Sequence, residues 1–297
     1  MGRGSNRRPD RYSAQNSAPK AWVRFPTTMK LLLTGAGGTL GRAVVAAARS
    51  QGHQVLPWPR AVLNPLEPAA HAEWIAAQSP EAILHLAVAS ESTGAPDEGR
   101  RVNVEWGCSL AETASRLGLP LVFSSTAMVY DAEADGPYTL ASPPTPRNDY
   151  GAQKLQAEHG MLLRHPSGVR IARLGWQIDP QRRDGNQMVA HAHREQLAQG
   201  HVNASRQWRP ACSFIDDTAR ALLGLLTQPA GVYLFDSNAE GVSFDRLLQA
   251  LSDAHGFGWQ VHPHDDYRHD QRMIDPRPGL PPLSARLPAL KPSPARG

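Results

Sequence analysis

Two hydrophobic patterns alternate along most of the chain. Short apolar runs ending in glycine or polar residues are typical of buried parallel strands, and stretches with an apolar residue every three or four positions are typical of helices. Strands are predicted at 30–35, 53–58, 82–89, 120–130 and 169–176, and helices at 40–52, 69–79, 102–118 and around 150–158. This alternation predicts an α/β protein with a doubly wound parallel sheet covered on both faces.

The pattern changes after Trp176. Helices are expected at 186–200, 214–226 and 243–256, with one more strand at 231–237, and no clear element is predicted beyond His262, where proline and histidine are frequent. We therefore expect a first domain over 29–178 and a smaller lobe over 179–297, with 211–236 returning to the core of the first domain.

The cysteines and histidines point to no metal site. Cys108 and Cys212 lie far apart and form no CxxC pair, so neither a disulfide framework nor a zinc signature is expected, and a reducing cytoplasm fits. The spacing of His191, His193 and His201 also matches no zinc pattern and suits a solvated helix face. No apolar run reaches the length needed to cross a bilayer.

Basic charge gathers at the start of the chain. The net charge is +4, but residues 1–28 carry six arginines and lysines against one aspartate, so the body is nearly neutral and nucleic-acid binding by it is not expected. Residues 1–28 are expected to be a disordered basic extension without the apolar segment of a signal peptide. Because the first predicted strand follows Met29 directly, we expect Met29 to be the natural start or residues 1–28 to be dispensable.

The first predicted strand runs into the sequence TGAGGTLG, with Gly35, Gly38 and Gly41 at every third position. The pyrophosphate of a dinucleotide requires free backbone amides at a helix N-terminus and no side chains in its way. A strand before the glycines and a helix after them is the context that this use requires. The loop therefore predicts a dinucleotide site.

The end of the second predicted strand bears on the choice of cofactor. An acidic residue there favours NAD by bonding the ribose 2′-hydroxyl, and a basic residue favours the 2′-phosphate of NADP. This chain has LPWPRAVLN, with no acid and with Arg60 available. We therefore expect NADP, with NAD as the alternative.

Hydroxyl side chains and a tyrosine–lysine pair supply candidate chemistry. The strand LVFSSTAMVY brings Ser124, Ser125 and Thr126 to its carboxyl end, where open parallel sheets place their chemistry. Tyr150 precedes Lys154 by four residues, about one helical turn, so the phenol and the ammonium share a helix face.

In their order and spacing these motifs resemble the extended branch of the short-chain dehydrogenase/reductase superfamily. The resemblance runs from Met29 to at least Gly231, and it rests on TGAGGTLG, PEAILHLA, Asn103 in VNVEWG, SSTAMVY and YGAQK. The stretch from Ser124 to Glu158 looks most like the dTDP-4-dehydrorhamnose reductase family. The resemblance implies a Rossmann fold with a smaller C-terminal substrate-binding lobe, and an NAD(P)-dependent reductase of a keto group on a nucleotide-linked sugar.

The same resemblance implies roles for individual residues. Thr126 is the hydroxyl residue, Tyr150 the proton donor and Lys154 its partner, which also bonds the cofactor ribose. The remaining cofactor contacts implied are Gly35, Gly37, Gly38, Thr39, Leu40, Gly41, Arg60, Asn64 and Ala87, and the substrate contacts are Ser125, Trp176, Asn186 and Arg209. A phenol ionises near pH 10, and we expect the Lys154 charge to lower the pKa of Tyr150 towards working pH.

Two departures from the reductase pattern bear on the alternatives. Ala127 stands where relatives have an aspartate after the threonine, and the family's C-terminal helix is not expected in LPALKPSPARG. Dehydratases place Asp-Glu after the threonine, so Ala127 and Met128 speak against dehydration. A nucleotide-sugar 4-epimerase with tightly bound NAD stays open, and so does a non-catalytic cofactor-binding regulatory subunit. The sugar, its nucleotide and a homodimer are also open.

Overall fold

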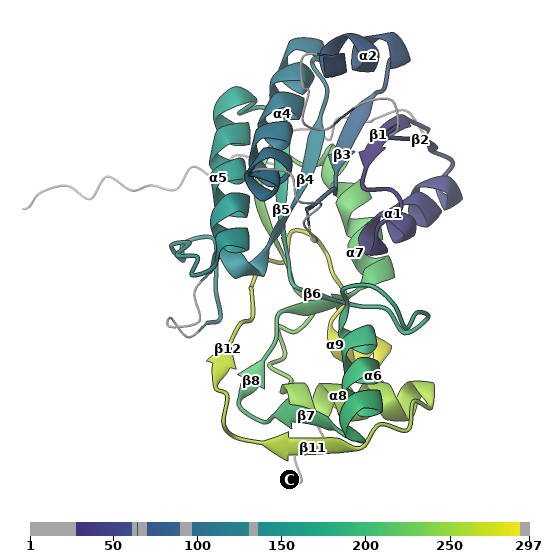
Figure 1. Cartoon of the computed structure of the whole chain (residues 1–297), viewed down its shortest axis with the longest axis vertical. Coiled ribbons are helices and arrows are strands. Elements are labelled where there is room, and N and C mark those ends of the chain that lie inside the picture. Colours follow the sequence, from purple (N-terminus) through teal and green to yellow (C-terminus); the bar gives the residue numbers. More distant parts are fainter. Residues whose placement is uncertain (1–27, 61–63, 65–69, 90–96, 131–135, 292–297) are drawn as a thin grey trace, which may run out of the picture.

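The computed structural model describes residues 28–60, 64, 70–89, 97–130 and 136–291. The predicted disorder of 1–28 therefore lies, except for Thr28, outside the described residues. A six-stranded sheet forms the centre of the upper domain in Figure 1. Its order is β2-β1-β3-β4-β5-β10, and every pairing is parallel. The strands are β1 (Lys30–Thr34), β2 (Gln54–Pro57), β3 (Ala82–His85), β4 (Leu121–Thr126), β5 (Val169–Leu174) and β10 (Gly231–Phe235).

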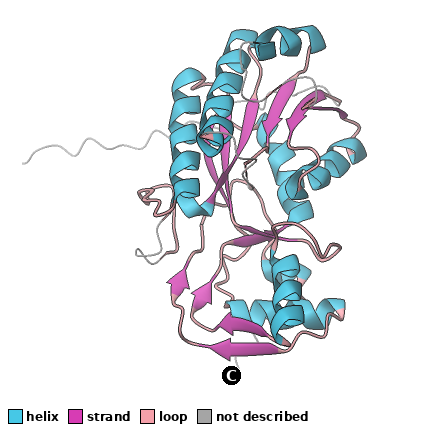
Figure 2. Cartoon of the chain, viewed as in Figure 1, coloured by secondary structure: helices cyan, strands magenta, loops and turns pink. Residues whose placement is uncertain are grey.

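Helices cover both faces of this sheet, as the predicted doubly wound fold requires (Figure 2). On one face, Leu31 and Leu33 of β1 pack with residues of α1 (Thr39–Ser50) and α7 (Ile215–Gly224). On the other, Leu32 packs with α2 (His71–Gln78), α4 (Trp106–Leu117) and α5 (Asp149–Arg164). Alternate strand residues point to opposite faces, so one apolar run supplies both cores. The predicted fold class is confirmed.

The strand order reverses between β1 and β3, since β2 lies on one side of β1 and the later strands on the other. In open parallel sheets a ligand binds at such a switch point, outside the carboxyl ends of the strands. The glycine loop follows β1, Ala87 lies beyond β3, and Thr126 ends β4. Three predicted site segments therefore leave neighbouring strands at one edge of the sheet.

A second lobe lies beyond this edge and has its own hydrophobic core (Figure 1). It contains three two-stranded sheets, β6·β9, β7·β11 and β8·β12. Its elements are β6 (Trp176–Ile178), α6 (Met188–Gln199), β7 (Val202–Ser205), β8 (Trp208–Arg209), β9 (Cys212–Phe214), α8 (Phe244–His255), β11 (Val261–His264), β12 (His269–Asp270) and α9 (Leu283–Arg286). Between β9 and α8 the chain returns to the central sheet through α7 and β10.

The end of the chain differs from the expectation of no clear element beyond His262. Strands β11 and β12 form there because they pair with β7 and β8, which lie about sixty residues earlier. Helix α9 is short, and Arg286 at its end bonds Asp217 in the first turn of α7 at 2.7 Å. Contacts distant in sequence stabilise these elements, and a local pattern does not reveal them.

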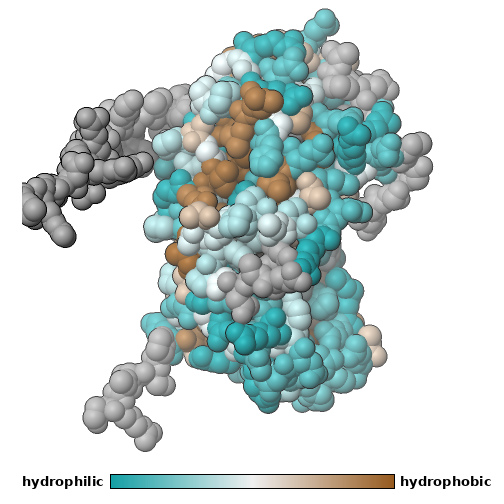
Figure 3. All heavy atoms as spheres, turned by 90° about the vertical axis from the view of Figure 1, so that its left-hand side faces the viewer, coloured by the Kyte–Doolittle hydropathy of each residue, from teal (hydrophilic) through white to brown (hydrophobic). Residues whose placement is uncertain are grey.

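Hydrophobic side chains gather on part of the surface that α5 borders, whereas the second lobe is mostly hydrophilic (Figure 3). Leu163 of α5 is 82% exposed. No helix in the described parts of the chain combines the length and apolarity needed to span a bilayer.

Candidate active site

The glycine loop packs closely against Leu86 and Ala87, the residues that follow β3. Gly35 has a φ of +71°, and a Cβ on it would lie 2.8 Å from the amide nitrogen of Ala87. A Cβ on Gly41 would overlap the carbonyl oxygen of Gly35. Both positions therefore require glycine, the first for its backbone conformation and both for close approach.

The loop leaves the N-terminus of α1 free for an anion. Gly38 occupies the N-cap position, where no side chain caps the helix, and the first turn of α1 carries no acidic residue. Gly37 and Gly38 are exposed, while Thr39 and Leu40 are half-buried. Unpaired amides and the positive end of the helix dipole attract a phosphate group. The described residues of this loop thus fit the pyrophosphate of a dinucleotide.

A threonine not singled out in the sequence holds the glycine loop beside β3. The Thr34 hydroxyl oxygen accepts hydrogen bonds from the amides of Leu86 and Ala87, at 3.1 and 3.2 Å. Thr34 Oγ1 also lies 2.7 Å from Nδ1 of His85, so the hydroxyl donates its proton to that ring. His85 is fully buried.

Asn103 links the segment after β3 to α5 by two hydrogen bonds. Its side-chain oxygen accepts from the amide of Ala89 at 3.0 Å, and its nitrogen donates to Gln153 at 2.8 Å. Asn103 lies in a π-helical turn, η2 (Arg101–Glu105), immediately before α4. Such turns often occur at functional sites. Asn103 belonged to a recognised motif, but its partner could not be read from the sequence.

The predicted catalytic residues lie on two contacting elements, Thr126 at the end of β4 and Tyr150 and Lys154 in α5. Thr126 is 8% exposed, and its hydroxyl oxygen accepts from the amide of Met128 at 3.1 Å. The ammonium nitrogen of Lys154 lies 5.9 Å from the centre of the Tyr150 ring and donates to the carbonyl of Ser124 at 2.9 Å. A Cβ on Gly151 would overlap the carbonyl oxygen of Met128, so this glycine lets α5 approach β4.

Burial controls the electrostatics of this pair. It raises the pKa of Tyr150 to about 12. It also lowers the pKa of Lys154 to about 7, although the charge of Glu158 acts in the opposite direction. The expected lowering of the pKa of Tyr150 by Lys154 is therefore wrong for this structure. Loss of hydration raises the pKa of the Tyr150 phenol. The Lys154 ammonium does not offset this, because it bonds the Ser124 carbonyl and not the phenol.

The family resemblance implied that Ser125 contacts the substrate, but in the structure its hydroxyl bonds Glu158. Neighbouring strand residues point to opposite faces, and the Ser125 hydroxyl donates to Oε1 of Glu158 at 2.5 Å. Ser125 is only 3% exposed. We withdraw it as a substrate contact, because its hydroxyl is committed to a buried carboxylate.

The cofactor residues beyond the second strand are exposed. Arg60 follows β2 by three residues, and its side chain is exposed. Asn64 is also exposed, and its carbonyl accepts from Nε2 of His71 at 2.8 Å. Both lie near the edge of the sheet, while 61–63 and 65–69 are outside the described residues.

The remaining predicted substrate residues lie in the second lobe. Trp176 begins β6, and its ring stacks on Trp208 with centroids 6.1 Å apart. Arg209 is half-buried in β8, beside β12. Asn186 is exposed in the loop before α6, where Gly185 closely approaches the Thr39 hydroxyl at the start of α1. This loop brings the lobe against the glycine-loop helix.

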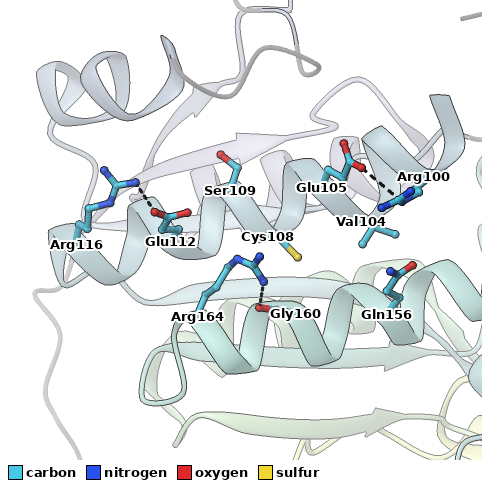
Figure 4. A pocket seen from close by; sticks show the side chains of 10 residues that line it. All are labelled: Arg100, Val104, Glu105, Cys108, Ser109, Glu112, Arg116, Gln156, Gly160 and Arg164. Carbon is cyan, nitrogen blue, oxygen red and sulfur yellow. Dashed lines mark hydrogen bonds and ion pairs between the residues drawn. The ribbon is translucent and has the colours of Figure 1, made fainter. Parts of the chain in front are cut away.

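A separate groove of about 570 Å³ lies between α4 and α5 (Figure 4). It holds no predicted site residue and is bordered by two exposed ion pairs, Arg100–Glu105 and Arg116–Glu112. Its lining residues are Arg100, Val104, Glu105, Cys108, Ser109, Glu112, Arg116, Gln156, Gly160 and Arg164. Its lining includes no residue from the carboxyl ends of the strands.

Comparison with known proteins decides the family. The model of the RmlD substrate binding domain family matches residues 29–263. The chain belongs to this family. The RmlD-family chain is 25% identical over 263 residues to dTDP-4-dehydrorhamnose reductase of Mycolicibacterium smegmatis, which covers 86% of this chain and 78% of the relative. It is 26% identical over 242 residues to methionine adenosyltransferase 2 subunit beta of Xenopus tropicalis, covering 76% and 72%.

The fold of this RmlD-family chain also has solved counterparts. The structure of dTDP-4-dehydrorhamnose reductase from Bacillus anthracis in complex with NADP superposes with a TM-score of 0.73. It covers 88% of this chain and 98% of the other, at 17% identity. The predicted superfamily and family are thus confirmed.

Proposed function

We propose that this chain is an NAD(P)-dependent oxidoreductase that reduces the keto group of a nucleotide-linked sugar. The observation that carries the proposal is that Thr126 ends β4 at the sheet edge that also carries the glycine loop, and that Lys154, beside Tyr150, bonds the Ser124 carbonyl of the same strand. Membership of the RmlD substrate binding domain family and the named reductase relatives support the same activity.

The roles of the described residues follow from their positions. The amides around Gly37 and Gly38 hold the cofactor pyrophosphate, and the lobe over 179–297 holds the sugar nucleotide against the crevice. The cofactor, when bound, supplies the hydride. Thr126 binds the keto oxygen: its oxygen already accepts from Met128, so its proton is free to donate.

Tyr150 gives its proton to the oxygen as negative charge develops there. With burial raising the pKa of Tyr150 to about 12, the phenol is protonated at neutral pH and is ready to act as an acid. Lys154 lies behind it and, when charged, stabilises the phenolate that remains. In reduction the protonated phenol is the required form, so the raised pKa suits the donor role.

NADP is the cofactor that we propose, with NAD as the alternative. The exposed guanidinium of Arg60 follows β2, where the adenosine ribose of a dinucleotide lies, and no acidic residue stands beside it in the sequence LPWPRAVLN. A 2′-phosphate carries charge that a guanidinium binds strongly. The relative from Bacillus anthracis was solved with NADP.

A second function has a specific observation in its favour. One relative is named as a subunit of methionine adenosyltransferase, and it aligns with 76% of this chain. A cofactor-binding regulatory subunit would keep the glycine loop without needing the triad. Retention of Thr126, Tyr150 and Lys154, with the Lys154 ammonium over the Tyr150 ring, favours the enzyme.

The decisive experiment separates these functions. Bound cofactor should first be released from the purified protein and identified, and NADPH oxidation then measured against a panel of nucleotide-linked 4-keto sugars. Turnover supports the reductase, tightly held NAD with sugar interconversion would indicate an epimerase, and cofactor binding without turnover would indicate a regulatory subunit.

Location and assembly complete the proposal. We propose a cytoplasmic protein, in line with two cysteines that are both free and buried. A homodimer stays a prediction, which sedimentation of the full chain checks.

A further inference from the structure

A buried carboxylate outside the predicted triad lies one helical turn beyond Lys154. Glu158 is 1% exposed, and its Oε2 accepts from Nη2 of Arg173 at 2.6 Å. Its Oε1 accepts from Nε of Arg173 at 3.1 Å and from the Ser125 hydroxyl at 2.5 Å. Arg173 in turn donates to the hydroxyl of Tyr130 at 2.7 Å. Three donor groups, two from Arg173 and one from Ser125, thus fix one carboxylate inside the fold.

This cluster is joined to Lys154 through both α5 and β4. Glu158 follows Lys154 by four residues, so both side chains lie on one face of α5. The Ser124 carbonyl accepts from Lys154 while the next residue, Ser125, bonds Glu158. An isolated ammonium is costly to bury, and a fixed negative charge nearby offsets that cost.

We propose that Glu158 is a positioning residue that keeps the buried Lys154 side chain charged beside Tyr150, and that Arg173 and Ser125 hold its carboxylate in place for this purpose. The inference rests on the proposed function, because the charge of Lys154 matters for the phenol only if proton transfer occurs there.

The groups around Lys154 support this assignment. Tyr150 and Glu158 face it from α5, and His85 faces it from β3, while Arg173 of β5 reaches it through Glu158. Burial and the charge of Lys154 lower the pKa of His85 to about 3, so this ring is neutral. Burial lowers the pKa of Lys154 to about 7, and Glu158 opposes this. Loss of the Glu158 charge would lower the pKa of Lys154 further.

The chain allows a direct measurement, because it has four lysines: Lys20, Lys30, Lys154 and Lys291. In protein labelled with ¹³C-lysine, the Lys154 signal is assigned by its loss in Lys154→Met, and its titration is followed by NMR without substrate. We expect Glu158→Gln to lower its midpoint by about one pH unit or more, which is a tenfold change in proton affinity.

Two matched variants separate charge from structure. Ser125→Ala removes one hydrogen bond to the same carboxylate but keeps the charge, so the midpoint should stay within about 0.3 unit. Glu158→Asp keeps the charge at a greater distance and should give an intermediate midpoint. If Glu158→Gln does not fold because Arg173 is left unpaired, the double variant Glu158→Gln/Arg173→Gln should still titrate below the wild type.

The outcomes also distinguish this inference from the proposed function. An unchanged midpoint in Glu158→Gln, or in the double variant, overturns the inference even if the protein reduces keto sugars. A lowered midpoint accompanied by an equal shift of the alkaline limb of kcat/KM supports it. If the midpoint falls but the protein reduces no keto sugar, Glu158 does control the charge of Lys154. The catalytic purpose proposed for that control is then wrong.

Discussion

The ammonium nitrogen of Lys154 lies 5.9 Å from the centre of the Tyr150 ring, one turn away along α5. At this distance the ammonium faces the aromatic ring as a cation–π contact. The lysine bonds the Ser124 carbonyl instead, which joins the start of α5 to β4. Helix α5 thus positions the phenol of Tyr150, and the hydrogen bond to β4 fixes the amine of Lys154.

Replacement of Tyr150 by phenylalanine tests the proton donor. We expect kcat to fall by about 10²–10⁴-fold, the usual contribution of a general acid, with the Kd for NADP nearly unchanged. Steady-state kinetics and cofactor titration measure these quantities. Tyr233→Phe is the control. The Tyr233 hydroxyl donates to the carbonyl of Pro229, which precedes β10 and is not part of the triad. A Tyr150→Phe enzyme with normal kcat would remove the role given to Tyr150.

Gly41→Ala tests the glycine loop. The added Cβ would overlap the Gly35 carbonyl, so the loop must shift, and we expect loss of both cofactor affinity and thermal stability. In Gly224→Ala of α7 a Cβ meets nothing within 4 Å, so this control should gain stability, by about 0.5–1 kcal/mol from helix propensity. Calorimetry and NADP titration compare the two, and unimpaired NADP binding by Gly41→Ala would contradict the proposed site.

Arg60→Ala tests the choice of cofactor. Loss of a charged contact to the 2′-phosphate costs about 1.5–3 kcal/mol, so the Kd for NADP should rise roughly tenfold or more while that for NAD changes little. Arg49→Ala, which removes another exposed arginine at the end of α1, should leave both constants unchanged. Equal losses for NADP and NAD in Arg60→Ala would show that Arg60 does not read the phosphate.

Lys154→Met tests the cost of burying the amine. Burial lowers the pKa of Lys154 from 10.5 to about 7, so between these values the unfolded chain binds a proton that the native protein does not. Stability should therefore rise with pH between 7 and 10 because of this group, by roughly 1–2 kcal/mol from pH 7 to 9. Urea unfolding of wild type and Lys154→Met at both pH values should show this rise only in the wild type. The same slope in both proteins would place the titration elsewhere.

Several features of the site could be predicted from the sequence because they depend on local spacing. TGAGGTLG between a strand and a helix predicts a pyrophosphate loop, and four residues between Tyr150 and Lys154 place both on one helix face. Apolar runs such as 82–89 predict buried parallel strands, and the sheet has β3 at Ala82–His85. Each inference needs only one turn or one strand of context.

Other features depend on segments that are distant along the chain. Whether Ser125 faces a substrate or Glu158 depends on which side of β4 the helix α5 covers, and β12 becomes a strand only beside β8. The pKa of Tyr150 rises because surrounding elements exclude water, although its neighbour in sequence is a lysine. The sequence by itself determined the alternation of strands and helices in the first domain, the glycine loop and the Tyr-Lys spacing. Only the tertiary structure decided which side chains are buried together, because desolvation and long-range pairing arise when distant segments pack.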